Sequence, residues 1–127
     1  LSFGHMVGMA PWQMGTKSTG SQFRSWSYVV DCASAILYIL LKGKNGEAYN
    51  IADEASNISI RELAEITASM VGRKVVMEVP DETERKGYNP VSKSVYSVEK
   101  LKTLGWQPAT SIKDGIRKTI NHLQSKP

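Results

Sequence analysis

The sequence predicts an α/β fold, a small lobe in which short strands alternate with helices. Hydrophobic residues make up 41% and charged residues 22% of the 127 residues, which is typical of a folded globular domain. Segments rich in β-branched and aromatic residues alternate with segments whose apolar residues recur at helical spacing. Serine and glycine residues stand where these helices would begin and end. We therefore expect one lobe over residues 17–127.

The first strand–helix unit covers residues 23–43. The segment 23–30 (FRSWSYVV) predicts a strand, and Asp31 is the expected N-cap of a helix that runs through Leu41. Gly43 stands where that helix should end. The helix has apolar residues at helical spacing, namely Ala33, Ile36, Leu37, Leu40 and Leu41.

The middle of the chain continues the alternation. Residues 48–52 and 74–79 each predict a short strand. Between them, Ser59 and Glu62 form a Ser-x-x-Glu capping box that opens a helix ending at Gly72.

The last third predicts a loop followed by two helices. Residues 81–94 are polar and include glycine and proline, so we expect a loop. Ser97 would cap a short helix to Leu104, and Ser111 would cap the final helix. That final helix carries apolar residues on one face, namely Ile112, Ile116, Ile120 and Leu123.

Cysteine and histidine are too scarce for a disulfide framework or the usual zinc site. The chain has one cysteine, Cys32, and two histidines, His5 and His122. No apolar run approaches the roughly 18 residues of a membrane span. We expect no metal site, no membrane span and a reducing, cytoplasmic setting.

The charge is unevenly distributed. The net charge is +4, and from Arg85 onward nine basic residues face two acidic ones. This excess favours an anionic partner, either nucleic acid or a phosphorylated small molecule. The alternative is a solvated, lysine-rich surface.

Residues 1–16 differ from the remainder, because they show neither helical nor strand periodicity. The tripeptide 4–6 (Gly-His-Met) resembles a cloning scar. We expect a cloning-derived or disordered leader; the alternative is a native segment that packs through Trp12.

No catalytic motif is visible. The chain has no Gly-x-Gly-x-x-Gly, P-loop or Gly-x-Ser-x-Gly sequence. Tyr-x-x-x-Lys spacing occurs at Tyr38–Lys42 and Tyr96–Lys100, and a neighbouring ammonium can turn a phenol into a base. Both spacings are weakly specific, so we assign no catalytic residue.

Motifs in chain order resemble the extended short-chain dehydrogenase/reductases, the NAD-dependent nucleotide-sugar epimerases and dehydratases. The matching segments are 24–31 (RSWSYVVD), 46–51 (GEAYNI), 59–72, 101–108 (LKTLGWQP) and 111–123. The resemblance covers the C-terminal part of such an enzyme. It implies a substrate-binding lobe of a Rossmann-type enzyme without the NAD-binding core.

The resemblance also implies the chemistry. The parent enzyme would use NAD to transform a UDP- or dTDP-sugar, as an isomerase or a lyase. The family's glycine-rich NAD loop and catalytic tyrosine lie earlier in the chain than the matched part. We therefore expect the 127-residue chain alone to be inactive and to bind no cofactor.

The resemblance assigns diphosphate contacts to arginines. Arg24 falls on the family's phosphate-binding arginine, and Arg85 resembles a later Arg-x-Gly arginine that also contacts the diphosphate. Here Tyr88 follows where the family usually has aspartate, so Lys86 competes with Arg85 for the role. Trp26 falls on an aromatic position near the nucleotide. A guanidinium suits this task because its planar donors match phosphate oxygens.

Two other functions remain open from the sequence. One is a free-standing basic module that binds nucleic acid or another polyanion. The other is self-association through apolar surface that the larger lobe of the parent enzyme would bury.

Overall fold

The computed structural model describes residues 18–85 and 91–125, and they form the α/β lobe that the sequence predicts. The predicted leader, residues 1–16, lies outside the described residues. The elements in chain order are β1 (Phe23–Ser25), α2 (Val29–Lys42), the 3-10 turn η1 (Glu54–Ser56), β2 (Asn57–Ser59), α3 (Ile60–Met70), α4 (Glu82–Arg85), β3 (Lys93–Ser94), α5 (Glu99–Lys102) and α6 (Ile112–Gln124).

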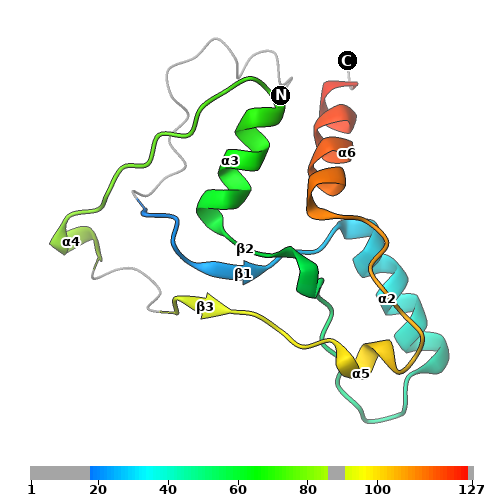
Figure 1. The fold of residues 1–127 in the computed structure, drawn as a ribbon. Coiled ribbons are helices and arrows are strands. Elements are labelled where there is room, and N and C mark those ends of the chain that lie inside the picture. Colours follow the sequence, from blue (N-terminus) through cyan, green and yellow to red (C-terminus); the bar gives the residue numbers. More distant parts are fainter. Residues whose placement is uncertain (1–17, 86–90, 126–127) are drawn as a thin grey trace.

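The strands form one small mixed sheet in the order β2-β1-β3. β1 pairs antiparallel with β2, with Phe23 opposite Ser59, and parallel with β3, with Arg24 opposite Ser94. In Figure 1 the sheet crosses the centre, α3 and α6 stand together on one side of it, and α2 lies at the outer edge. β1 is therefore the central strand, held on both sides by segments distant in sequence.

The α2 helix begins earlier than predicted. The strand expected over 23–30 ends at Ser25, and the helix begins at Val29 after an N-cap at Tyr28. Asp31 is not the cap: it lies in the first turn, is buried, and its Oδ2 accepts a 3.0 Å hydrogen bond from the backbone N–H of Thr110. Asp31 therefore ties α2 to the segment before α6.

Gly43 ends α2, as the sequence predicts. Its N–H donates a 2.8 Å hydrogen bond to the carbonyl of Ile39. A Cβ at position 43 would lie 2.4 Å from that carbonyl oxygen. Glycine is therefore required by the close approach of the two backbones.

The predicted capping box opens α3. Ser59 Oγ accepts from the backbone N–H of Glu62 at 3.1 Å, and Glu62 Oε2 accepts from the backbone N–H of Ser59 at 2.8 Å. These bonds favour the carboxylate, so the Ser59 backbone N–H and then its hydroxyl hold the pKa of Glu62 below its usual range. Gly72 follows the helix with a positive φ of 67°.

Two predicted strands are absent, and two short strands were missed. Residues 48–52 and 74–79 lie outside any helix or strand. Neither segment has a neighbouring strand among the described residues, and a strand exists only where backbone groups pair across a ladder. β2 and β3 are three and two residues long, too short to show a period of two in sequence.

The region predicted as a loop over 81–94 contains α4 and β3. α5 is shorter than predicted, since it covers Glu99–Lys102 with Val98, not Ser97, at the N-cap position. α6 begins after Ser111 as predicted, and Ser111 Oγ accepts from the N–H of Asp114 at 3.2 Å.

The core lies between α2, α5 and the segments beside them. Its fully buried members are Ala35, Ala52, Val98, Leu101 and Trp106. The indole N–H of Trp106 donates to Ser34 Oγ at 2.9 Å, so its one polar atom is satisfied. No helix among the described residues has the length and apolar character needed to cross a membrane.

Candidate functional site

Arg24, the first predicted diphosphate contact, lies in the middle of β1 and is half-buried. One terminal nitrogen donates to the carbonyl of Phe23 at 2.7 Å; the other donates to Gln22 Oε1 at 2.9 Å and to the carbonyl of Val91 at 3.2 Å. The guanidinium thus bridges β1 and the segment that leads into β3. All three acceptors are neutral oxygens, so the positive charge has no carboxylate partner in these bonds.

Trp26 follows β1 and joins it to β2. Its indole N–H donates to the carbonyl of Ile58 at 3.2 Å, and its backbone N–H donates to the carbonyl of Ser56 at 3.3 Å. The side chain is half-buried. The structure therefore gives Trp26 a packing and hydrogen-bonding role, and it lies two residues from Arg24 on the same extended segment.

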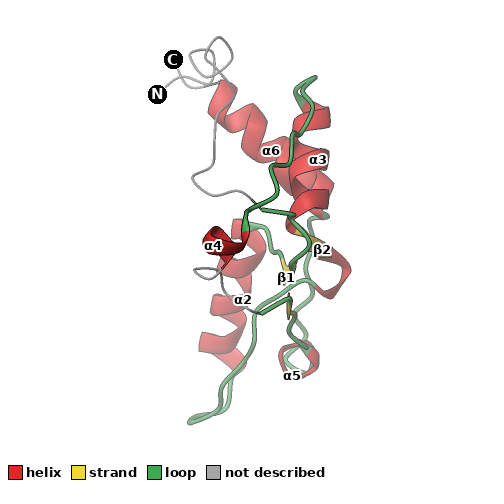
Figure 2. Ribbon diagram, turned by 90° about the vertical axis from the view of Figure 1, so that its left-hand side faces the viewer, coloured by secondary structure: helices red, strands yellow, loops and turns green. Residues whose placement is uncertain are grey.

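The other two predicted contacts do not join them. Arg85 is the last residue of α4, which stands apart from β1 in Figure 1; Figure 2 shows the same lobe turned by 90°. Lys86 lies outside the described residues. The described structure therefore brings together Arg24 and Trp26 only.

Sequence reasoning missed the serines around Arg24. Ser25 Oγ donates to Asn57 Oδ1 at 2.7 Å and accepts from the backbone N–H of Tyr96 at 3.1 Å, so one hydroxyl links β1 to β2 and to the chain after β3. The hydroxyl oxygen of Ser27 is buried without a hydrogen-bond partner among the described residues. Serine is too common for its type alone to have identified either position.

A charged cluster fastens α5 to η1. Lys102 Nζ donates to Glu54 Oε2 at 2.7 Å and to Glu99 Oε1 at 3.0 Å, and Glu54 Oε1 accepts from the N–H of Val98 at 3.1 Å. The hydrogen bond from Lys102, with that from Val98, lowers the pKa of Glu54, and the two carboxylates raise the pKa of Lys102. Glu54 is therefore ionised at neutral pH, which suits a structural ion pair and not a general acid.

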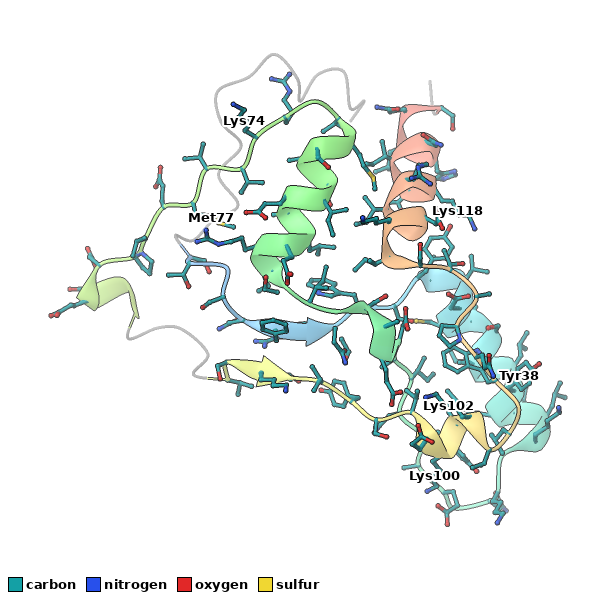
Figure 3. All side chains as sticks on the ribbon, viewed as in Figure 1. Tyr38, Lys74, Met77, Lys100, Lys102 and Lys118 are labelled. Atoms are coloured by element: carbon teal, nitrogen blue, oxygen red, sulfur yellow. The ribbon has the colours of Figure 1, made fainter. Side chains whose placement is uncertain are left out.

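Neither Tyr-x-x-x-Lys pair has the geometry of a catalytic base. Lys42 Nζ lies over the ring of Tyr38, 5.0 Å from its centroid, as a cation–π contact. The hydroxyl of Tyr96 accepts from Ser94 Oγ at 3.1 Å, while Lys100 pairs with Glu47. Lys42 therefore faces the ring of Tyr38, which Figure 3 labels on α2, and Lys100 is engaged by a carboxylate.

Several basic residues of the C-terminal third are held in pairs. Besides Lys100 and Lys102, Arg117 donates to Asp114 at 2.6 Å, and Lys118 lies 5.5 Å from the ring centroid of Tyr28. A cavity of about 230 Å³ is lined by Ala109, Thr110, Asp114, Arg117, Lys118 and Asn121, and it includes neither Arg24 nor Trp26. This arrangement does not favour a continuous basic face for a polyanion.

The described residues around Arg24 include no group that could hold a metal ion. No group of three histidine, cysteine, aspartate or glutamate side chains that could hold a metal ion occurs within residues 18–85 and 91–125. The site can therefore supply a cation and hydrogen-bond donors, which position an anion without reacting with it.

Comparison with known proteins agrees with this fold. The model of the family described as GDP-mannose 4,6 dehydratase matches residues 13–119. The dTDP-D-glucose 4,6-dehydratase of Bos taurus is 34% identical over 110 residues, covering 80% of this chain and 29% of the relative. The GDP-L-fucose synthase of Sinorhizobium fredii is also 34% identical, covering 84% of this chain and 32% of the relative.

Solved structures show the same relation. The dTDP-glucose 4,6-dehydratase of Bacillus anthracis, in complex with NAD, superposes with a TM-score of 0.70 at 26% identity, over 84% of this chain and 34% of that one. The UDP-glucose 4-epimerase of Thermotoga maritima, with UDP-glucose, gives a TM-score of 0.70 at 26% identity, over 85% and 33%. The chain thus spans about a third of the length of the proteins it matches. Through the family model, the relatives and the shared fold, it belongs to the GDP-mannose 4,6-dehydratase family, a branch of the extended short-chain dehydrogenase/reductases that act as NAD-dependent nucleotide-sugar epimerases and dehydratases.

Proposed function

We propose that this chain is the substrate-binding part of an NAD-dependent nucleotide-sugar epimerase or dehydratase, and that Arg24 binds the diphosphate of the nucleotide sugar. The observation that carries the proposal is the position of Arg24 on the central strand β1, where its guanidinium bonds to three neutral oxygens of the described residues. Relatives named for dTDP-, GDP- and UDP-sugar chemistry support the substrate class.

Phosphate oxygens are better acceptors for the Arg24 guanidinium than the neutral oxygens that it contacts in this structure. The carbonyls of Phe23 and Val91 and the amide of Gln22 carry no charge. A diphosphate carries negative charge on several oxygens, so it pairs with the guanidinium as an opposite charge and can accept two parallel hydrogen bonds from it, which these neutral acceptors cannot match. Arg24 would therefore exchange neutral acceptors for phosphate oxygens when substrate binds. Arg85 and Lys86 are proposed as a second contact with the diphosphate.

NAD would be bound by other residues. Nicotinamide dinucleotides are held by a glycine-rich turn between a strand and a helix, and no such sequence is present in this chain. The residues present therefore do not fit the cofactor, and we derive no hydride step from them. In the whole enzyme, hydride transfer would belong to the part of the relatives that this chain does not match.

The diphosphate contact is tested by titrating the chain with UDP, dTDP and GDP while following its amide NMR spectrum. We expect shifts led by residues of β1 and by Val91, and about 10- to 100-fold weaker binding for Arg24→Ala, as one to two charge-assisted bonds are lost. Arg117→Ala is the matched control, because it removes the same charge from an exposed α6 position. A dispersed spectrum that none of the nucleotides shifts, or equal loss in both variants, would contradict the role of Arg24.

Turnover provides a separate test. Purified chain supplied with NAD and a panel of UDP- and dTDP-sugars should convert none of them, because it contains no dinucleotide-binding turn. Reproducible product above a buffer control would contradict the proposal that NAD is bound by residues outside this chain.

A further inference from the structure

Arg24 is held by a side chain from the segment that leads into β1. Of the three acceptors of its guanidinium, the carbonyls of Phe23 and Val91 belong to the backbone, and Gln22 Oε1, at 2.9 Å, belongs to a side chain. A guanidinium has donors and no acceptor, so the atom of the Gln22 amide that faces it has to be the oxygen. Among these three contacts, Gln22 is therefore the one at which a substitution changes what Arg24 is bonded to.

The backbone at Gln22 is fixed from two directions. Its carbonyl accepts a 3.0 Å hydrogen bond from the N–H of Ile60, at the start of α3, and the N–H of Phe23 donates to the carbonyl of Ser92 at 2.8 Å. In Figure 1 this is the blue segment that enters β1 beside the start of α3. Side chains two residues apart lie on the same side of an extended chain. Gln22 and Arg24 are accordingly both half-buried, whereas Phe23 between them is exposed, so the amide is held next to the guanidinium.

Arg24 differs from the basic side chains that fasten the lobe through ion pairs. Three of those side chains are paired with carboxylates, namely Lys100, Lys102 and Arg117. A carboxylate partner fixes a cation in place and also offsets its charge. Within residues 18–85 and 91–125, Arg24 forms no such pair, and the amide of Gln22 stands where a carboxylate of the same length would form one. The fold therefore holds this guanidinium without neutralising it.

The neutrality of the Gln22 side chain matters for an anionic ligand. A guanidinium pairs with a carboxylate as it does with a phosphate, through opposite charges and two parallel hydrogen bonds. A glutamate at position 22 would therefore compete with a diphosphate for the same donors of Arg24. Its negative charge would also repel the diphosphate. An amide oxygen accepts the hydrogen bond and has neither effect.

We infer that Gln22 is a positioning residue for Arg24: its uncharged amide holds the guanidinium in place and keeps the positive charge available for the diphosphate. This inference rests on the proposed function. It assigns two separate properties to position 22, namely an acceptor that orients Arg24 and the absence of a negative charge. Each property is removed by a different substitution of about the same side-chain length, so the two can be measured separately.

The test compares Gln22→Glu, which keeps the acceptor and adds a charge, with Gln22→Met, which removes the acceptor and adds no charge. Gln124→Glu is the matched control, because it adds the same charge at the exposed end of α6. Binding of UDP is measured by calorimetry, and thermal unfolding is followed by circular dichroism. Rotation of the Arg24 guanidinium in the free chain is measured by nitrogen NMR, which reports the contact without any ligand.

The two variants should behave differently. Gln22→Glu should weaken UDP binding at least about tenfold while its melting temperature stays the same or rises, because an ion pair at a half-buried site is neutral to stabilising. A residue that only supports the fold would lose affinity and melting temperature together. Gln22→Met should weaken UDP binding about three- to tenfold, as one hydrogen bond is lost, and should speed rotation of the Arg24 guanidinium. Gln124→Glu should bind UDP like the unmodified chain.

Other results overturn the inference in recognisable ways. If Gln22→Glu binds UDP like the unmodified chain, the absence of charge at position 22 has no role. If both variants lose melting temperature along with affinity, Gln22 only supports the fold, and if Gln22→Met leaves the guanidinium rotation unchanged, Gln22 does not position Arg24. Failure of the proposed function looks different: Arg24→Ala would bind UDP like the unmodified chain, while Gln22→Met would still speed the rotation of the guanidinium.

Discussion

Leu101 and Leu40 provide a direct test of which side of the lobe is the core. Leu101, in α5, is 0% exposed and belongs to the central cluster with Trp106, whereas Leu40, in α2, is 76% exposed. The same substitution to alanine at both positions removes the same atoms from opposite environments.

The expected costs differ several-fold. Leucine to alanine removes about three carbon atoms, and at about 0.8 kcal/mol for each buried CH₂ the lost transfer free energy is about 2.4 kcal/mol. The cavity left at Leu101 adds to this, so the free energy of unfolding should fall by about 3 kcal/mol or more. At Leu40 only about a quarter of the side chain is buried, so the loss is about 0.6 kcal/mol, and the higher helix propensity of alanine offsets part of it.

Urea unfolding followed by circular dichroism measures both variants. Leu101→Ala should lower the free energy of unfolding by about 3 kcal/mol and the melting temperature by about 10 °C, since 1 kcal/mol corresponds to about 4 °C in a domain of this size. Leu40→Ala should remain within about 0.5 kcal/mol of the unmodified chain.

Two results would refute this reasoning. If Leu101→Ala cost less than about 1 kcal/mol, Leu101 would not lie in a close-packed core. If Leu40→Ala cost as much as Leu101→Ala, the outer face of α2 would be buried in the free chain. Sedimentation at several protein concentrations would then show whether self-association buries it.

Three further predictions concern the polar contacts. Asp31→Ala should destabilise the chain by about 1–3 kcal/mol in urea unfolding, because it leaves the backbone N–H of Thr110 without its acceptor. Asp31→Asn keeps an acceptor oxygen and should cost less. Equal costs for the two variants would argue against this hydrogen bond. Ser59→Ala should cost about 1 kcal/mol by removing half of the capping box, and no loss of stability would show that α3 does not depend on it. The pKa values of Glu54 and Glu62 are lowered in the folded chain, so their stabilisation is complete above the unfolded value of about 4.3 and is lost as the pH falls below it. The free energy of unfolding should fall between pH 6 and pH 3, and it should fall by less in Glu54→Gln. A free energy of unfolding that does not change over this range would contradict the lowered pKa values.

The family assignment and the helix boundaries with local signals were predictable from sequence. The Ser59–Glu62 capping box, the end of α2 at Gly43 and the start of α6 after Ser111 agree with the structure. Each depends on groups within four residues of one another, so the amino-acid order contains the whole interaction.

The strands and the role of Asp31 were not predictable in this way. β1 is a strand because Asn57–Ser59 and Lys93–Ser94 lie on either side of it, and these partners are remote in sequence. The strand-like segments 48–52 and 74–79 are not strands, because no described segment pairs with them. Asp31 has the residue type and position of an N-cap, yet its acceptor oxygen binds Thr110, far along the chain.

In the candidate site, too, some features were predictable from sequence and others were not. Sequence by itself determined the family, the α/β class and Arg24 as the residue to examine, since these follow from residue types in a fixed order. Only the tertiary structure decided that Arg24 bonds to neutral oxygens from two segments, that α4 stands apart from it, and that the outer face of α2 is exposed. The reason is physical: strand pairing, long-range hydrogen bonds and burial are properties of two surfaces brought together, and a linear pattern describes only one of them.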